Sequence, residues 1–424
     1  MSKNILITGS TGYVGGRLVP KLLERGYNIR VLVRNPERLK NRSWHRKVEI
    51  FKGDVLQLET LSELFKNIDL AYYLIHGMSD AHDFETTDVK AASNFCLAAK
   101  SYPIKKIIYL GGLAESNGKL SKHLSSRHKT GEALRESGID ITEFRAGVIV
   151  GSGSLSFEMI RNLCERLPVM ICPKWVYTKT QPIAISNVLE YLVDIIITEI
   201  PINEIIEIGG KDVLSYGDMM RQYSIVRKLN RYLIPVPVLT PTLSSYWVHW
   251  TTPLSAKIIR PLVQSLKNES VVKNKNAAEY FQNINLISYR SAVELALETL
   301  NNELLETSWS DSLGSSGSLD ITVDIKSIEG LIIEKRSLII NCNDKKVFSY
   351  LMTLGGNNGW LYANFLWIIR GYIDLLVGGV GLRRGRRNST ELKQGDTLDF
   401  WRVEKLVANT LLRLKAEMKL PGKA

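Results

Sequence analysis

A glycine-rich stretch near the N-terminus holds the residues best suited to chemistry. It has the spacing T-G-x-x-G-x-x-G and consists of Thr8, Gly9, Ser10, Thr11, Gly12, Tyr13, Val14 and Gly15. The first glycine permits a tight turn, the second lets backbone N–H groups approach phosphates, and the third lets a helix pack close to a strand. An apolar strand precedes the loop and a helical pattern follows it, as the motif requires. We therefore expect a dinucleotide pyrophosphate here, with an ordinary glycine turn as the alternative.

The residue after the second expected strand (28–33) predicts which dinucleotide binds. Arg34 stands there, 19 residues beyond Gly15. An acidic residue would bind the ribose 2′-hydroxyl of NAD, whereas arginine suits the 2′-phosphate of NADP. Arg38, one helical turn further on, is a second candidate contact. The sequence thus favours NADP(H) over NAD(H), unless Arg34 is simply an exposed loop residue.

Strands and helices alternate along the first half of the chain. Apolar strands are expected at 4–8, 28–33, 48–51, 70–75, 106–110 and 141–145, and helices at 84–101 and 123–137. Gly26 is expected to end the first helix, inside which Pro20 should introduce a kink. This order predicts an α/β fold with a doubly wound parallel Rossmann sheet and its ligand at the carboxyl ends of the strands. Candidate cofactor contacts at those ends are Asp54, Val55, Ile75, His76, Gly111, Gly112 and Arg145.

The glycine loop, Gly53-Asp54 and Phe144-Arg145-Ala146-Gly147 together resemble the short-chain dehydrogenase/reductase superfamily in its extended and atypical branches. The resemblance covers about residues 1–300. It implies oxidation, reduction or epimerisation by a Ser–Tyr–Lys set, with Tyr and Lys spaced Y-x-x-x-K after the fifth strand. In that set the Tyr transfers the proton, while the Lys lowers the pKa of the Tyr and holds the ribose.

The chain departs from that pattern. Its Y-x-x-x-K, Tyr102 with Lys106, precedes the fifth strand, and glycines 111 and 112 stand where the Ser would follow it. The helix before Glu132 has no tyrosine. Arg127, His128 or Lys129 could replace the Lys as a ribose or phosphate contact. His76, His128 and Lys129 are the candidate catalytic residues, with a packing role for His76 as the alternative.

Residues 144–183 carry a more specific resemblance, through runs such as Gly151-Ser152-Gly153-Ser154 and Leu167-Pro168-Val169-Met170. They resemble an atypical bacterial subgroup described as nucleoside-diphosphate-sugar epimerases or NAD(P)-binding oxidoreductases. In that subgroup a domain similar to the helix-grip fold of polyketide cyclases and START proteins follows the Rossmann domain. A more distant resemblance is to the accessory NADPH-binding subunit of respiratory complex I.

These observations predict four segments. Residues 1–185 form the NAD(P)-binding core, 186–306 a substrate lobe with remaining Rossmann-associated elements, 307–320 a Ser/Gly linker, and 321–424 a partial START/cyclase-like α+β domain that looks incomplete. A helix at 187–197 and a strand at 205–210 are expected within the lobe. Trp247, His249 and Trp250 are candidate pocket-lining residues, with core packing as an equal alternative.

The C-terminal segment contains an apolar run at 359–382 with Arg370 and Asp374 in its middle. Because charges at mid-bilayer are costly, we expect a buried amphipathic helix rather than a membrane segment. The basic run 383–387 would meet phospholipid head groups or form an exposed loop, and peripheral membrane contact is the less favoured alternative. Strands are expected at 330–334, 337–340, 399–404 and 410–417.

The composition excludes several classes of protein. Lys and Arg number 55 against 43 Asp and Glu, a net charge of +12 that would favour an anionic ligand. No nucleic-acid-binding motif is present, so nucleic acid is not an expected partner. The four cysteines and six histidines have neither disulfide-framework nor metal-site spacing. The first strand follows Met1 almost directly, which leaves no room for a signal peptide and predicts a cytoplasmic setting.

The sequence therefore predicts an NADP(H)-binding oxidoreductase or epimerase-like enzyme that acts on an apolar or aromatic small molecule. The alternative is a non-catalytic NADP(H)-binding redox sensor or scaffold whose C-terminal domain holds a hydrophobic ligand. The missing Ser, Tyr and Lys favour the sensor, and the expected substrate lobe beside the nucleotide favours the enzyme.

Overall fold

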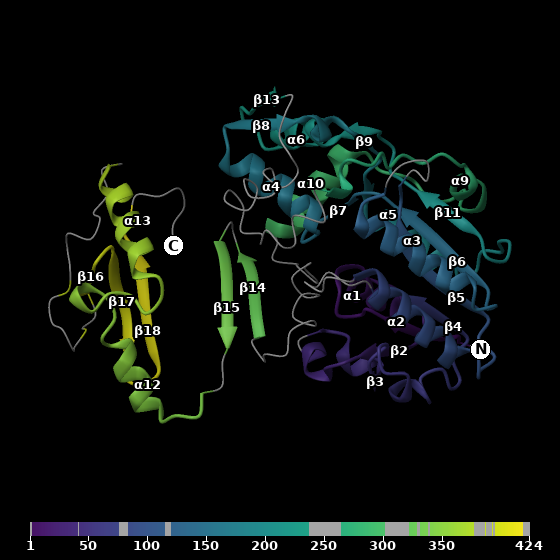
Figure 1. Cartoon of the computed structure of the whole chain (residues 1–424), viewed down its shortest axis with the longest axis horizontal. Helices are drawn as coiled ribbons and strands as arrows, with labels where there is room; N and C mark the ends of the chain where they lie inside the picture. The colour runs from purple at the N-terminus through teal and green to yellow at the C-terminus, as the bar shows by residue number, and fades with distance from the viewer. Residues whose placement is uncertain are drawn as a thin grey trace. The chain divides into compact units, whose positions relative to one another are not determined.

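The chain divides into two compact units, residues 1–319 and 320–424. The computed structural model (Figure 1) describes residues 2–40, 42–75, 84–114, 120–236, 264–301, 322–328, 331–337, 340–376, 386, 392 and 395–418. His76, Trp247, His249, Trp250, the predicted linker and most of the basic run 383–387 lie outside these residues. The predictions made for them stay predictions, as do the four segment boundaries.

A seven-stranded parallel sheet forms the centre of the first unit, and it confirms the predicted α/β fold. Its order is β11-β6-β5-β4-β1-β2-β3. The order reverses between β1 and β4, which is where such sheets bind their ligands. The strands are β1 (Asn4–Thr8), β2 (Asn28–Val33), β3 (Glu49–Lys52), β4 (Leu70–Tyr73), β5 (Lys106–Gly112), β6 (Ile141–Ala146) and β11 (Ile205–Ile208).

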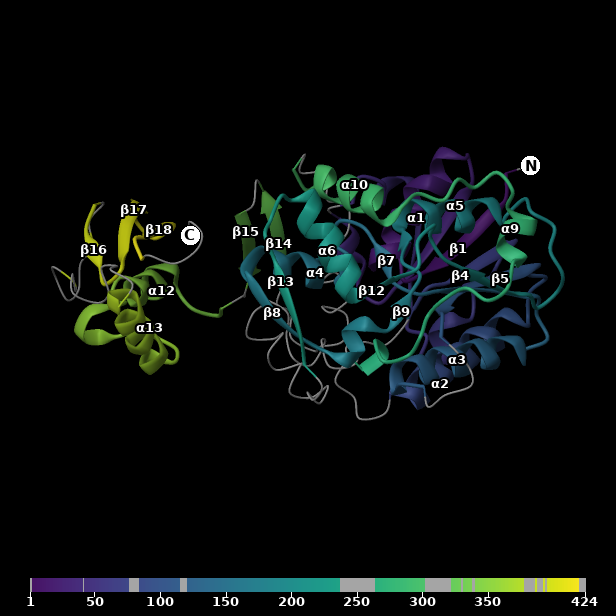
Figure 2. The ribbon, with the colours of Figure 1, turned by 90° about the horizontal axis from the view of Figure 1, so that it is seen from above.

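Helices cover both faces of this sheet, as Figure 2 shows from above. α1 (Tyr13–Glu24) and α5 (Ile185–Asp194) pack on one face, and α2 (Phe84–Ala99) and α3 (Lys122–Arg135) on the other. β1 shows why its sequence is apolar at successive positions. Ile5 and Ile7 join the core under α1 and α5, while Leu6 points to the opposite core under α2. Both faces are buried, so alternation with polar residues is absent.

The first helix ends at the predicted glycine and contains Pro20 in its interior. Gly26 follows the last turn at φ +80°, and its N–H donates to the Leu23 carbonyl oxygen. That left-handed conformation is what glycine supplies after a helix. Pro20 lies inside α1 without ending it. Nothing in the structure explains the choice of proline there.

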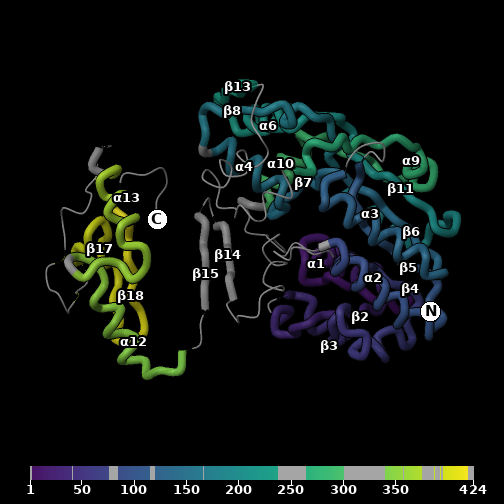
Figure 3. The backbone as a smooth tube through the Cα atoms, viewed as in Figure 1, coloured from purple at the N-terminus to yellow at the C-terminus, as the bar shows by residue number. Residues whose placement is uncertain are grey.

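A lobe is formed by residues that come after β6 in the chain, on both sides of the sheet strand β11, and Figure 3 traces it around α4, α6, β8 and β13. Its core gathers Phe157, Ile160, Met219, Tyr223 and Val293. The lobe also contains three two-stranded sheets, in which β7 pairs with β10, β9 with β12, and β8 with β13. Its elements are β7 (Ile149–Val150), α4 (Leu155–Arg166), β8 (Val169–Pro173), β9 (Lys179–Thr180), β10 (Ile183–Ala184), β12 (Leu214–Ser215), α6 (Tyr216–Val226), β13 (Tyr232–Val236) and α10 (Tyr289–Asn301). The short helix α9 (Asn276–Tyr280) packs instead on the main sheet beside β11.

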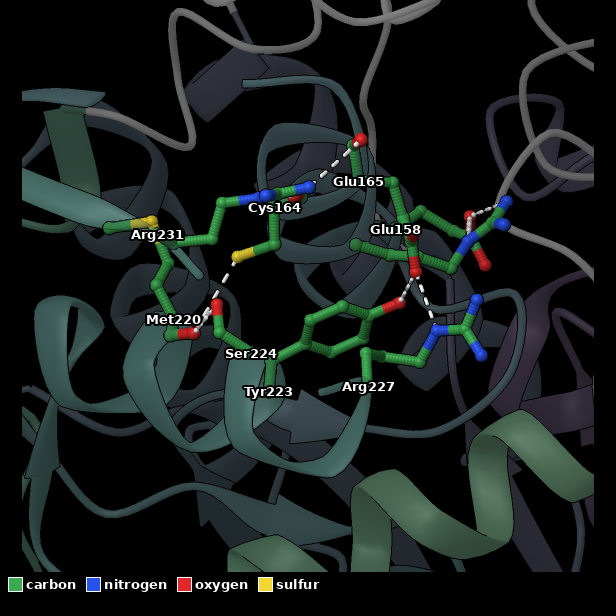
Figure 4. A network of polar contacts seen from close by, with 9 residues as sticks. Glu158, Cys164, Glu165, Met220, Tyr223, Ser224, Arg227 and Arg231 are labelled. Carbon is green, nitrogen blue, oxygen red and sulfur yellow. Dashed lines mark hydrogen bonds and ion pairs between the residues drawn. The ribbon is translucent and has the colours of Figure 1, made fainter. Parts of the chain in front are cut away.

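A polar network fastens α4 to α6 and the turn after it (Figure 4). The Glu165 carboxylate accepts from the Tyr223 hydroxyl at 2.8 Å and from Arg227 Nε at 2.7 Å. Arg231 donates to the Cys164 carbonyl oxygen. Burial, together with the Glu165 charge, raises the pKa of Tyr223 well above its usual value. Tyr223 is therefore a structural hydrogen-bond donor at neutral pH.

The second unit contains two separate antiparallel sheets among its described residues. β14 (Thr322–Ile328) pairs with β15 (Leu331–Ser337), and β16 (Thr397–Leu398) pairs with β17 (Trp401–Val407), which pairs with β18 (Leu411–Ala416). The predicted break at residues 335–336 is wrong, because β15 runs through it. The predicted strand start at 399 is also wrong. Asp399 has φ +56°, and its carboxylate accepts from the Gly356 N–H and Trp360 Nε1 in a turn.

Two helices, α12 (Asp344–Leu351) and α13 (Asn364–Leu376), accompany these strands. α13 corrects the prediction of a buried amphipathic helix. Only a narrow stripe of Trp367, Gly371 and Asp374 faces inward. The Trp367 ring stacks on the Phe400 ring, with 5.6 Å between the ring centroids. The remaining apolar side chains are exposed: Phe365, Leu366, Ile368, Ile369, Tyr372 and Ile373. Apolar periodicity predicted the helix but could not indicate which face is covered.

Candidate functional site

The glycine loop adopts the geometry that phosphate binding needs. Gly9 has φ +71°, and a Cβ on it would lie 2.6 Å from the Leu74 carbonyl oxygen. A Cβ on Gly15 would lie 2.4 Å from the Gly9 carbonyl oxygen, so α1 packs directly on the loop. Gly12 is the N-cap of α1 and has extended backbone. The loop thus presents the N-terminus of a helix at the switch point of the sheet, where an anion is favoured.

Polar side chains fix this loop and leave one hydroxyl without a partner. Thr8 Oγ1 donates to the Tyr72 carbonyl oxygen at 3.0 Å and accepts from the Leu74 N–H at 3.1 Å, which ties β1 to β4. Ser10 Oγ is fully buried and has no hydrogen-bond partner. A buried hydroxyl without a partner is costly, so a ligand at the loop that supplied one would remove that cost.

The residues predicted to select the cofactor lie at the ends of β2 and β3. Arg34 follows β2 and is exposed, and Arg38 is half-buried in the short helix Pro36–Leu39. After β3, Asp54 Oδ1 accepts from the Leu56 N–H at 3.0 Å, and Val55 is buried. Val33, the last residue of β2, pairs with Lys52, the last residue of β3, so these predicted contacts lie at one edge of the sheet.

At the ends of β4 and β5 the structure explains the pair of glycines. Ile75 packs against the core under α2. A Cβ on Gly112 would lie 2.9 Å from Leu124 Cδ2 and 3.1 Å from Arg127 Cδ, and one on Gly111 would approach the Glu143 carboxylate. Glycine at position 112 lets α3 pack close to β5, and glycine at position 111 leaves room for the Glu143 carboxylate. The place of the usual catalytic serine is thus occupied by a packing contact.

The three helical candidates on α3 face different surroundings. His128 is buried, and its Nε2 donates to the Gly112 carbonyl oxygen at 3.1 Å. Lys129 is exposed and forms an ion pair with Glu85. Arg127 accepts a hydrogen bond on its backbone from the Tyr109 hydroxyl, while its Nε is buried without a partner. The structure therefore separates Lys129 from the end of β5 and brings His128 and Arg127 to it.

Arg145, a predicted cofactor contact, belongs to a buried ionic cluster. Its Nε lies 2.7 Å from Glu143 Oε1, and Arg135 of α3 pairs with the other carboxylate oxygen. Burial lowers the pKa of both arginines somewhat. Glu143 itself is 0% exposed. The cluster fixes α3 on β6.

Sequence reasoning missed two groups near this site. Arg17 of α1 is buried, donates to the Ser152 carbonyl oxygen at 2.8 Å and lies over the Tyr13 ring at 4.7 Å. It joins the glycine loop to the start of the lobe. Burial raises the pKa of Tyr13 to about 12, so this phenol stays protonated. The signal for Arg17 was its position four residues after Tyr13, on the same helix face.

The second missed group is His123, in the first turn of α3. Its Nδ1 is buried without a hydrogen-bond partner. Burial, helped by the Arg127 charge, lowers the pKa of His123 to about 3. The imidazole is therefore neutral at physiological pH. Its position four residues before Arg127 was the available signal.

Acidification should destabilise the first unit through His123. Its pKa in the folded chain lies below the unfolded value near 6.5, so unfolding takes up a proton as the pH falls below 6.5. We expect wild type to lose of the order of 1–2 kcal/mol more between pH 6.5 and pH 5 than His123→Gln, which cannot titrate. Urea unfolding at both pH values measures this. Equal pH dependence in both proteins would contradict it.

Two family models match the chain. Residues 9–157 match a family described as NAD(P)H-binding, and residues 333–424 match a family of unknown function, DUF2867. The first segment is therefore an NAD(P)H-binding domain of the Rossmann type. The second match, to a family of unknown function, does not test the predicted likeness to START and cyclase domains, which stays a prediction.

Known proteins with a similar sequence or fold include reductases, epimerases and a photosystem II assembly factor. Divinyl chlorophyllide a 8-vinyl-reductase of Cucumis sativus is 23% identical over 226 residues, 49% of this chain and 52% of that protein. This chain thus spans about half the length of that relative. Triphenylmethane reductase of Citrobacter sp. shares the fold at a TM-score of 0.56 and 18% identity, over 70% of this chain and 99% of that one. NADPH-dependent quinone oxidoreductase QOR2 of Escherichia coli, complexed with NADPH, also shares the fold. Its TM-score is 0.56 at 16% identity, and the match covers 68% of this chain and 98% of that one.

The described residues contain no group of three or more His, Cys, Asp or Glu side chains arranged to hold a metal ion. Within the same residues, no helix has the length and apolarity to cross a membrane. All four cysteines are free, and Cys342 is exposed. The glycine loop and the carboxyl ends of β4, β5 and β6 are thus the candidate site.

Proposed function

We propose that the first unit is an NADP(H)-dependent oxidoreductase that reduces an apolar or aromatic small molecule without the usual Ser–Tyr–Lys set. The observation that carries the proposal is the glycine loop at the switch point, where a Cβ on Gly9 or Gly15 would meet backbone. The loop N–H groups would hold the pyrophosphate and Arg34 the 2′-phosphate. When bound, the nicotinamide supplies a hydride.

Solved structures with this fold include reductases and epimerases alike, and the relative that matches by sequence, the chlorophyllide vinyl-reductase, favours a reductase. The two reductases of the same fold are a quinone oxidoreductase complexed with NADPH and a triphenylmethane reductase. The names of these proteins describe reductions of a chlorophyllide, a quinone and a triphenylmethane, which are largely apolar, unsaturated molecules. We infer that this chain acts on a substrate of that class.

Titration with NADPH and NADH, followed by nicotinamide fluorescence, tests the proposal. Bound NADPH should then be oxidised by a member of a panel of quinones and aldehydes. Tight binding without oxidation by any of them would favour the redox sensor. Failure to bind either nucleotide would overturn the cofactor assignment itself.

Arg34 is expected to set the preference for NADPH. Arg34→Gln should weaken NADPH binding about tenfold and leave NADH binding nearly unchanged, because a charge-assisted contact to phosphate stabilises by about 1.5–3 kcal/mol. Fluorescence titration with both nucleotides measures the ratio. Lys40→Gln removes an exposed cation six positions after Arg34 and is the control. If Arg34→Gln lowers the affinities for NADPH and NADH equally, Arg34 does not bind the 2′-phosphate.

A further inference from the structure

His123 and Arg127 share one face of α3 near its N-terminus. They lie four residues apart, so their side chains are neighbours on the helix surface. The Arg127 charge contributes to the lowered pKa of His123, consistent with that proximity. Arg127 Cδ lies close to Gly112, the last residue of β5. The pair is therefore at the carboxyl edge of the sheet, where the ligand of this fold lies.

The lobe reaches the same end of α3. Ser121, the N-cap of the helix, shares a hydrogen bond of 2.9 Å with the Ser265 hydroxyl, and its N–H donates to Asn268 Oδ1 at 3.2 Å. His123 follows this cap by two residues. The pair thus lies where the lobe meets the sheet, which is where a second ligand would contact the nucleotide.

Both side chains carry a buried polar atom without a partner. His123 Nδ1 and Arg127 Nε are inaccessible and make no hydrogen bond. A buried guanidinium N–H without an acceptor costs free energy that an incoming acceptor would recover. The adjacent residues of α3 do have partners, since His128 donates to the Gly112 carbonyl oxygen and Lys129 pairs with Glu85.

We propose that His123 and Arg127 form an oxyanion-binding pair for the substrate of the proposed reductase. The guanidinium would bind a carboxylate or a similar oxyanion, and the neutral imidazole would donate the second hydrogen bond. The inference rests on the proposed function and narrows it, because the apolar substrate would then carry an oxyanionic group. Neither residue needs to transfer a proton for this role.

Oxalate binding to the full chain saturated with NADPH tests the pair. Oxalate is a small carboxylate probe, and isothermal titration gives its affinity while the His123 imidazole NMR signal reports the place of binding. Arg127→Gln should weaken oxalate about tenfold or more, the usual effect of losing a charge-assisted hydrogen bond, and His123→Gln about fivefold. Lys122→Gln removes an exposed cation from the same helical turn and should change the affinity less than twofold.

Measuring oxalate binding with NADPH already bound distinguishes a site for a substrate oxyanion from a site for a phosphate of the nucleotide. If NADPH displaces oxalate, the pair binds a phosphate of the nucleotide, and the proposal is overturned. Equal oxalate affinity in wild type and Arg127→Gln, or no shift of the His123 signal, also overturns it. If Arg127→Gln does not fold, Arg127→Lys keeps the charge, loses the planar fork, and should still weaken oxalate. If the wild type binds NADPH but not oxalate, the oxyanion-binding pair is ruled out and the proposed function is not. If it binds oxalate but not NADPH, the proposed function is ruled out.

Discussion

Gly15→Ala is expected to weaken NADPH binding strongly and to destabilise the first unit by about 1–3 kcal/mol, the cost of forcing atoms into a closely packed site. The added Cβ would lie 2.4 Å from the Gly9 carbonyl oxygen and 2.8 Å from its carbon, so backbone must move. The helix N-terminus then shifts away from the phosphates. We expect NADPH affinity to fall about 100-fold, since each 1.4 kcal/mol is a factor of ten. Urea unfolding and fluorescence titration measure the two effects.

Two further glycines separate cofactor binding from stability. A Cβ on Gly12 meets one atom, the Gly9 carbonyl oxygen, at 3.2 Å, so Gly12→Ala should fold. It should still weaken NADPH about tenfold or more, because the methyl group stands where the backbone must approach the phosphates. Gly26 has φ +80° and open space around its Cβ position. Gly26→Ala should cost about 1–2 kcal/mol of strain and leave NADPH affinity unchanged. Unchanged NADPH affinity in Gly12→Ala would mean that the loop does not cradle the phosphates.

The first unit was largely predictable because its signals are local. A parallel sheet with both faces buried makes each strand a short apolar run, and β1 and β2 have the bounds that the sequence predicted. The edge strand β11 lies in the segment 186–306, which was predicted to hold the lobe and the remaining Rossmann-associated elements, and it pairs with β6 in the main sheet. Pairing between distant segments leaves no mark on the period of either strand, so the sequence could not assign it.

The candidate site was only partly predictable for the same reason. The glycine loop is contiguous in sequence and carries its own geometry. His123 is a candidate because its helix neighbours Arg127 and Ser121 contact Gly112 and Ser265, residues far apart in the chain. α13 shows the converse. Its apolar residues are spread around the helix, and only the packing of Trp367 on Phe400 shows which stripe is inside.

Glu143 was not predicted as a special residue, and it should have one of the largest effects on stability. This carboxylate is 0% exposed in the middle of β6 and pairs with Arg135 and Arg145. Glu143→Gln keeps the shape but leaves two partly buried guanidinium groups without their counter-charge. Removing one partner of a buried pair typically costs about 3–5 kcal/mol. We expect a loss of that size in urea unfolding of the first unit.

The same substitution tests how the candidate site is held in place. A Cβ on Gly131 of α3 would lie within 3 Å of the Glu143 carboxylate, so helix and carboxylate are in direct contact. Loss of the charge should therefore loosen α3 and with it the positions of His123 and Arg127. Glu132→Gln changes an exposed carboxylate of the same helix and should stay within about 0.5 kcal/mol of wild type. If the two variants are equally stable, the cluster is not what fixes α3 to the sheet.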